Sequence, residues 1–78
     1  MTLKIVSAER IEYEGEVRLV SLPGEMGLFE VLNNHAALIA SLTAGIVAYE
    51  TIDGFRGTYE IHGGVADVND NVVSVCIY

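Results

Sequence analysis

The chain is short of residues that several protein classes need. Its 78 residues include one cysteine, Cys76, and one lysine, Lys4. A single cysteine cannot form an internal disulfide, which is consistent with a reducing, intracellular setting. We predict that Cys76 is a small buried side chain in the last strand. Lys4 does not fall in a hairpin turn, which is where a biotinyl or lipoyl carrier domain of similar size needs its modified lysine.

Positive charge is also scarce. Four basic residues stand against eleven acidic ones, which gives a formal net charge of −7 at pH 7. The basic residues are spread along the chain and form no stripe that could neutralise nucleic-acid phosphates. Anionic lipid headgroups would be repelled by the same surface. We therefore expect neither nucleic-acid binding nor direct insertion into a membrane.

Long apolar runs are missing as well. The longest are far shorter than a membrane span, and the first residues lack the apolar core of a signal peptide. Yet 51% of the residues are hydrophobic and the mean hydropathy is +0.41. A domain this small has a thin core, so some apolar residues must stay exposed, and a contiguous patch of them indicates a protein partner. We expect a chain that is cytosolic or held peripherally at a membrane by a protein partner.

Short apolar runs separated by turn residues fill the chain. Alternation of apolar and polar residues indicates half-buried strands, and no long amphipathic helix is present. We predict that residues 1–78 form a single all-β domain, a small antiparallel β-sandwich of about eight to ten short strands. The best hairpin signals are Asp53-Gly54 and Asn69-Asp70-Asn71.

The segment from Gly15 to Gly24 leads to three specific expectations. Gly15 should interrupt the strand in which it lies. Pro23-Gly24 should end the following strand in a turn. The residues expected on one face of that strand are Val17, Leu19 and Ser21.

Residues with catalytic or metal-binding potential are few. Neither His35 nor His62 has further His, Cys or carboxylate ligands at a metal-binding spacing. We interpret His62 as a strand-end residue and His35 as a turn residue that is hydrogen-bonded to local backbone. Residues 67–71 lack the Gly and the distal Glu of an EF-hand loop, so we predict a hairpin turn there. The neighbouring carboxylates of Glu12, Glu14 and Glu16 are interpreted as a solvated strand edge.

The glycine-containing run at residues 23–27 is not a phosphate-binding loop. It has neither the Lys-Ser/Thr ending nor the following helix that such a loop needs. We therefore expect no catalytic residue, no bound cofactor and no metal site in this chain.

An ordered set of residues gives the chain a specific resemblance. The set consists of Ser7-Ala8-Glu9, Tyr13-Glu14-Gly15-Glu16-Val17, Leu22-Pro23-Gly24, Gly27, Phe29, Val31-Leu32, His35-Ala36, Leu38-Ile39, Leu42, Gly45, Gly63 to Val68 and Asn71 to Val75. It resembles the N-terminal β-sandwich domain of epsilon subunits of F-type ATP synthases over essentially the whole chain. The chain departs from the family pattern at Glu30 (commonly Gly), Asn33-Asn34 (commonly Pro-Gly) and Ala37 (commonly Pro).

The resemblance implies a non-catalytic rotor subunit of the central stalk. Such a subunit docks the gamma subunit onto the c-subunit ring and takes part in coupling hydrogen-ion or sodium-ion flow to ATP synthesis. By position in the resemblance, Met26, Gly27 and Leu28 contact the c ring, and Ser7 and His35 lie near gamma and the ring. The expected location is the F1 sector, peripheral to the energy-coupling membrane on its cytoplasmic face. Most family members continue into a C-terminal helical hairpin that can restrain rotation, and we expect the docking domain without that hairpin.

Two other function classes stay open on the residues alone. One is a free-standing β module that binds a small ligand, which would need a convergent polar cluster inside an apolar pocket. The other is an enzyme subunit completed by residues of a partner. Co-purification separates the three, because a rotor subunit should be recovered with gamma and c.

Overall fold

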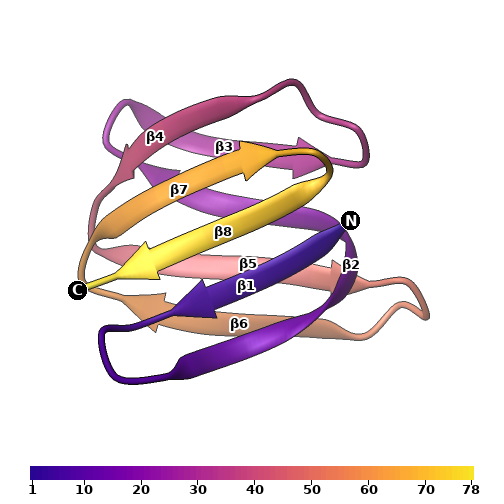
Figure 1. Cartoon of the computed structure of the whole chain (residues 1–78), viewed down its shortest axis with the longest axis horizontal. Coiled ribbons are helices and arrows are strands. Elements are labelled where there is room, and N and C mark those ends of the chain that lie inside the picture. The colour runs from indigo at the N-terminus through magenta and orange to yellow at the C-terminus, as the bar shows by residue number, and fades with distance from the viewer.

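A computed structural model describes all 78 residues and contains eight β-strands and no helix (Figure 1). It confirms the predicted all-β sandwich. The strands are β1 (Thr2–Val6), β2 (Ile11–Gly24), β3 (Gly27–Leu32), β4 (Leu38–Leu42), β5 (Gly45–Thr51), β6 (Arg56–Ile61), β7 (Gly64–Asn69) and β8 (Val72–Ile77). No helix long and apolar enough to cross a membrane is present.

The strands stack as two layers with the core between them. Figure 1 shows β4, β7, β8 and β1 side by side in one layer, and β3, β2, β5 and β6 in the layer behind. Hydrogen bonds join them into one sheet in the order β1-β8-β7-β4-β2-β5-β6, and β3 pairs with β2. β2 links the layers because it pairs with β1 along its first half and with β3 and β5 along its second half. All pairs are antiparallel except β1 with β8.

Side chains that alternate along the strands form the core. Leu3 and Ile5 of β1 and Val73 and Val75 of β8 are fully buried, and the residues between them are half-exposed. Successive side chains of a strand point to opposite faces, so every second one enters the space between the layers. The ten largest fully buried side chains are all Leu, Ile or Val. Branched aliphatic residues suit such a pleated, buried surface.

The expectation for Gly15 and the face of β2 is wrong. β2 continues through Gly15, which pairs with Leu3 of β1. Further along, Val17 pairs with Thr51 and Leu19 with Glu50, so β2 holds one extra residue, Arg18, in a β-bulge. A bulge shifts the alternation of side chains by one residue. Leu19 and Ser21 are therefore only half-buried, and the core side chains of β2 are Val17, Val20 and Leu22.

Two further expectations need correction. Pro23-Gly24 does not end β2 in a turn, because both residues pair with β3 and the turn falls at Glu25 and Met26. Cys76 is exposed. Since Val73 and Val75 point into the core, the two-residue period of β8 places Cys76 on the outer face.

The predicted hairpins are confirmed. β5 and β6 join across Asp53-Gly54, where Gly54 has a φ of 92°. β7 and β8 join across Asp70-Asn71, with φ values of 51° and 61°. Two successive residues with positive φ make a turn that matches the twist of the flanking strands, and Asn and Asp tolerate that conformation. His62 lies exposed just after β6, as predicted for a strand-end residue.

Candidate functional site

The turn between β2 and β3 projects apolar side chains into solvent. Met26 is 102% exposed and Leu28 is 73% exposed. They lie on either side of Gly27, whose φ of 127° favours glycine. Met26 and the exposed Ile39 of β4 line a shallow hollow of about 320 Å³. We call Met26, Gly27, Leu28 and Ile39 the apolar tip. Exposed apolar groups at one tip fit contact with another protein better than free solvation.

The apolar tip stands on a rigid base. The Glu25 N–H donates to the Ser41 carbonyl at 2.9 Å, and the Thr43 N–H donates to the Pro23 carbonyl at 2.9 Å. These bonds tie the hairpin to the end of β4. A Cβ on Gly24 would come within 2.9 Å of the Phe29 ring, so a glycine is needed at the end of β2. The turn is thereby held in one position relative to both layers.

Ser7 lies in the β1–β2 turn and is engaged within that turn. Its Oγ accepts from the N–H groups of Glu9 and Arg10, both at 3.3 Å. The same hydroxyl lies 3.0 Å from a carboxylate oxygen of Glu12 and 3.2 Å from the Arg10 carbonyl. Its immediate role is to shape the turn, which lies at the same end of the sandwich as the apolar tip (Figure 1).

His35 lies at the other end of the sandwich, in the β3–β4 connection (Figure 1). This connection lies beside the β7–β8 turn, since the Asn34 N–H donates to the Asn71 side chain at 2.8 Å. The His35 N–H donates to the Leu32 carbonyl at 3.2 Å, and its Nδ1 lies 2.7 Å from the Ala36 carbonyl. A carbonyl only accepts, so Nδ1 carries the proton in this contact. The interpretation of His35 as a turn residue bonded to local backbone is confirmed, and the structure does not bring it near Met26, Gly27 or Leu28.

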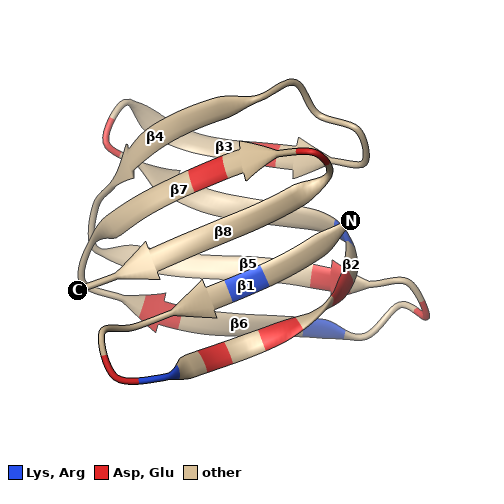
Figure 2. Cartoon of the chain, viewed as in Figure 1, with Lys and Arg blue, Asp and Glu red and all other residues tan.

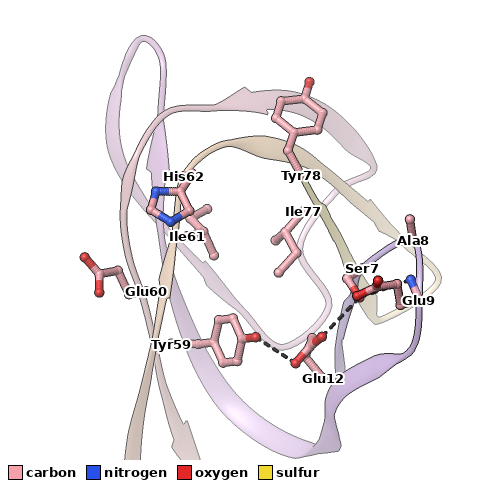
Figure 3. Close-up of a pocket in the computed structure, with 10 residues that line it drawn as sticks. All are labelled: Ser7, Ala8, Glu9, Glu12, Tyr59, Glu60, Ile61, His62, Ile77 and Tyr78. Atoms are coloured by element: carbon pink, nitrogen blue, oxygen red, sulfur yellow. Dashed lines mark hydrogen bonds between the residues drawn. The ribbon is translucent and has the colours of Figure 1, made fainter.

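A hollow of about 630 Å³ opens at the end where the chain finishes (Figure 3). It lies between the β1–β2 turn, the end of β6 and the end of β8. Its lining residues are Ser7, Ala8, Glu9, Glu12, Tyr59, Glu60, Ile61, His62, Ile77 and Tyr78. Figure 3 shows the Tyr59 hydroxyl pointing at Glu12 across the mouth, with His62 and Tyr78 at the opposite rim.

Glu12 holds the two sides of this hollow together. Its carboxylate accepts from the Tyr59 hydroxyl at 2.8 Å and from the Arg10 Nε at 3.1 Å. These bonds favour the charged carboxylate, so the pKa of Glu12 lies below its ordinary value, first because of Tyr59 and then because of Arg10. The same bond raises the pKa of the Tyr59 hydroxyl. The interpretation of Glu12 as part of a solvated strand edge missed this contact, because Tyr59 lies 47 residues away in the sequence.

The hollow has no arrangement for covalent or acid–base chemistry. Glu12 is held as a carboxylate, Tyr59 is harder to ionise than a free tyrosine, and His62 makes no side-chain hydrogen bond. Nowhere in the chain do three His, Cys, Asp or Glu side chains converge as a metal site would require.

Comparison with known proteins identifies the family of this chain. Residues 1–77 match the family described as the ATP synthase Delta/Epsilon chain, beta-sandwich domain. The chain belongs to this family. The ATP synthase epsilon chain of Rickettsia typhi is 36% identical over 94% of this chain, and that of Campylobacter lari is 43% identical over 96%. The chain spans 68% and 58% of those two relatives.

A solved assembly agrees with this assignment. One chain in the structure of the Euglena gracilis mitochondrial ATP synthase, OSCP/F1/c-ring, superimposes with a TM-score of 0.89 at 28% identity. The match covers 96% of this chain and 48% of that one. The resemblance seen in the sequence is therefore confirmed as family membership, and the strands that carry the apolar tip belong to the shared sandwich.

Proposed function

We propose that the chain works in the rotor of an F-type ATP synthase, where it docks the gamma subunit onto the c ring. Family membership makes it an epsilon-type, non-catalytic subunit of the central stalk. The contacts with gamma and the c ring, and the share in coupling ion flow to ATP synthesis, are the parts that we propose.

The apolar tip is the observation that carries this proposal. Met26 is fully exposed and Leu28 is 73% exposed, on a hairpin that hydrogen bonds fix to β4. A rotor joint has to transmit torque without slipping. Apolar side chains on a fixed turn suit that task, because the backbone of the turn loses little conformational freedom on binding and burial of the side chains is favourable.

The five residues assigned from the resemblance divide between the two ends of the sandwich. Met26, Gly27, Leu28 and Ser7 share one end, and we assign that end to the c ring (Figure 1). His35 occupies the opposite end, so we assign it to gamma. The subunit would then sit in the F1 sector, peripheral to the membrane on its cytoplasmic face.

The structure gives no support to a small-ligand module. The hollow in Figure 3 does bring polar groups together, but Glu12, Tyr59 and Ser7 bind one another and leave no convergent set facing a ligand. A ligand pocket needs polar groups free to fix the orientation of its ligand.

Co-purification tests the proposal. The full chain, carrying an affinity tag, is expressed in its source cells and recovered from gently solubilised membranes. We expect gamma and c subunits to be recovered with it in stoichiometric amounts. Recovery of the chain without gamma and c, from membranes that contain assembled synthase, would contradict the proposal.

A further inference from the structure

The outer face of the β3–β2–β5–β6 layer holds a buried carboxylate beneath two arginines. Glu50 is 6% exposed and is the one charged residue among the buried side chains. It does not belong to the core, since Val47 and Tyr49 of the same strand face inward and Glu50 alternates with them. Strand pairing places Leu19, Glu50 and Arg56 in one row across β2, β5 and β6.

Both oxygens of Glu50 are bound by arginine. The Nε of Arg18 donates a hydrogen bond to Oε2, and its Nη2 forms an ion pair with the same oxygen. The Nε of Arg56 forms an ion pair with Oε1 at 3.0 Å. The bulge in β2 is what directs Arg18 to this position. A buried carboxylate is stable only when it is paired and hydrogen-bonded, and two guanidinium groups meet that need here.

The pairing leaves both arginines with unused donors. A guanidinium has five N–H bonds, and Arg56 uses only its Nε in this cluster. The side chains of Arg18 and Arg56 are 59% and 83% exposed. Glu50 therefore fixes the two guanidinium groups from below and leaves their remaining N–H bonds facing solvent, in a geometry suited to a second carboxylate.

Two basic residues lie together at this place, whereas the other two stand apart. Arg10 pairs with Glu12, and Lys4 stands opposite Glu14 in the sheet, so each has one acidic neighbour. Arg18 and Arg56 share the carboxylate of Glu50, and Glu30 lines the same hollow, so two positive and two negative charges balance here. Figure 2 shows acidic residues spread through the strands and turns of both layers. An acidic group of a partner would thus be repelled by most of this surface and least of all here, where free N–H groups of two arginines can bind it.

Apolar side chains frame the arginines. A hollow of about 480 Å³ is lined by Arg18, Leu19, Glu30, Leu32, Glu50 and Arg56. Leu32 is 54% exposed and Leu19 is half-buried. Exposed leucine beside arginine is a composition typical of protein interfaces. Glu30 makes no ion pair with either arginine, so its charge weakens the binding of one carboxylate and opposes a polyanion more strongly.

We propose that this arginine face, defined as Arg18, Leu19, Leu32 and Arg56 over Glu50, binds a protein surface through one carboxylate side chain framed by apolar residues. It lies outside the set Met26, Gly27, Leu28, Ser7 and His35. It adds a second, charge-selective contact to the proposed rotor function, and the second test below rests on that function.

The first test probes the face directly. The full chain, labelled with ¹⁵N, is titrated with acetyl-Leu-Glu-Leu-amide and with the neutral acetyl-Leu-Gln-Leu-amide at millimolar concentrations. We expect saturable shifts of the Arg18 and Arg56 Nε–Hε signals with the Glu peptide and little change with the Gln peptide. Equal responses to both peptides, or none, would overturn the inference whatever assembly the chain joins.

The second test measures binding to the purified complex of alpha, beta and gamma subunits. We expect Arg56→Gln and Arg18→Gln to weaken binding about tenfold or more, since truncating one partner of a hydrogen-bonded charge pair carries a penalty of that size. Arg10→Gln is the matched control, because Arg10 is also exposed and paired with one carboxylate. Arg18→Gln leaves Glu50 less well paired, so thermal melting of each variant has to show that it is folded.

The outcomes separate the inference from the proposed function. Binding of the wild-type chain together with unchanged binding of both variants would refute the arginine face and leave the rotor function standing. Failure of the wild-type chain to bind would count against the rotor function, and the peptide titration alone would then decide the inference.

Discussion

The Tyr59 hydroxyl donates a hydrogen bond of 2.8 Å to the carboxylate of Glu12, and this bond joins β6 to the start of β2 across the mouth of the end hollow (Figure 3). The two strands are not paired through their backbones. Side chains therefore fasten this part of the sandwich, and the contact depends on the charge of Glu12.

Acid should loosen the sandwich through Glu12. Its folded pKa lies below the ordinary value of 4.5, so the unfolded chain takes up the proton first as the pH falls. The stabilisation is complete above about pH 5 and is lost as the pH drops through the lowered pKa. We expect Glu12→Gln to have a melting temperature that falls less steeply between about pH 5 and pH 3 than that of the wild type.

A second acidic group and a control variant make the acid experiment specific to Glu12. Asp53, whose pKa is lowered chiefly by the Thr51 hydroxyl, should maintain part of the acid dependence in the Glu12 variant. Glu14→Gln is the matched control, because Glu14 is exposed on the same strand and makes no side-chain hydrogen bond in the structure. Parallel pH profiles for Glu12→Gln and the wild type would contradict the role assigned to Glu12.

Removing core volume should nearly exhaust the stability of the domain. Leu22 is 0% exposed, and a Leu→Ala change at such a site costs about 2–5 kcal/mol. A core in a chain this small supplies only about 3–5 kcal/mol. We expect Leu22→Ala to be largely unfolded or to unfold at very low urea concentration, as followed by circular dichroism.

A milder and a neutral variant complete that comparison. Ile5→Val should cost about 0.5–1.5 kcal/mol, which leaves a measurable urea transition. Leu32→Ala, at a residue that is 54% exposed, should change the free energy of unfolding by about 0.5 kcal/mol or less. Similar losses for Leu22→Ala and Leu32→Ala would mean that the assigned core of β2 is wrong.

Strand positions and turns could be predicted from the sequence because their causes are local. Alternating side chains report a strand from within the strand, and Asp53-Gly54 or Asp70-Asn71 make a turn through their own backbone preferences. The bulge at Arg18 is different. It arises where β2 pairs with β5, about thirty residues later, and it decides that Val20 and Leu22 rather than Leu19 enter the core.

The surface features divide in the same way. The sequence indicates a turn close to Met26 and Leu28 but places it too early, at Pro23-Gly24, because the pairing of these two residues with β3 leaves no local signal. The contact of Glu12 with Tyr59 and the binding of Glu50 by Arg18 join residues 47 and 32 positions apart. Such contacts depend on which strands come together in the fold, and no local sequence pattern shows this. The burial predicted for Cys76 failed for a related reason, since register alone decides its face.

The thiol of Cys76 should react readily in the folded chain. It is exposed on β8, beside Val6 and Val65 of the neighbouring strands. We expect a thiol reagent to label the native protein completely, at a rate close to that in denaturant, because the exposed thiol is already accessible in the folded chain. In a Cys76→Ser background, Val75→Cys is the buried control and should be protected until the protein unfolds. Protection of native Cys76 would show that β8 is out of register.

The apolar tip should be needed for coupling and not for folding. Leu28→Asp places a charge on a residue that is 73% exposed, so the free energy of unfolding should change by about 0.5 kcal/mol or less. At a contact with the c ring the same carboxylate would lose its water, which should weaken binding to the purified ring about tenfold or more. In the assembled synthase, reconstituted in vesicles, we expect fewer ions pumped per ATP hydrolysed.

Ile52→Asp is the matched control for the tip. Ile52 is 67% exposed in the β5–β6 turn, which lies at the opposite end of the sandwich from Leu28 (Figure 1). It carries the same chemical change at the end assigned to gamma and not at the tip, so binding to the purified ring should equal that of the wild type. Equal losses in both variants would indicate a general effect of added charge. Normal pumping with Leu28→Asp in a fully assembled enzyme would remove the apolar tip from the joint.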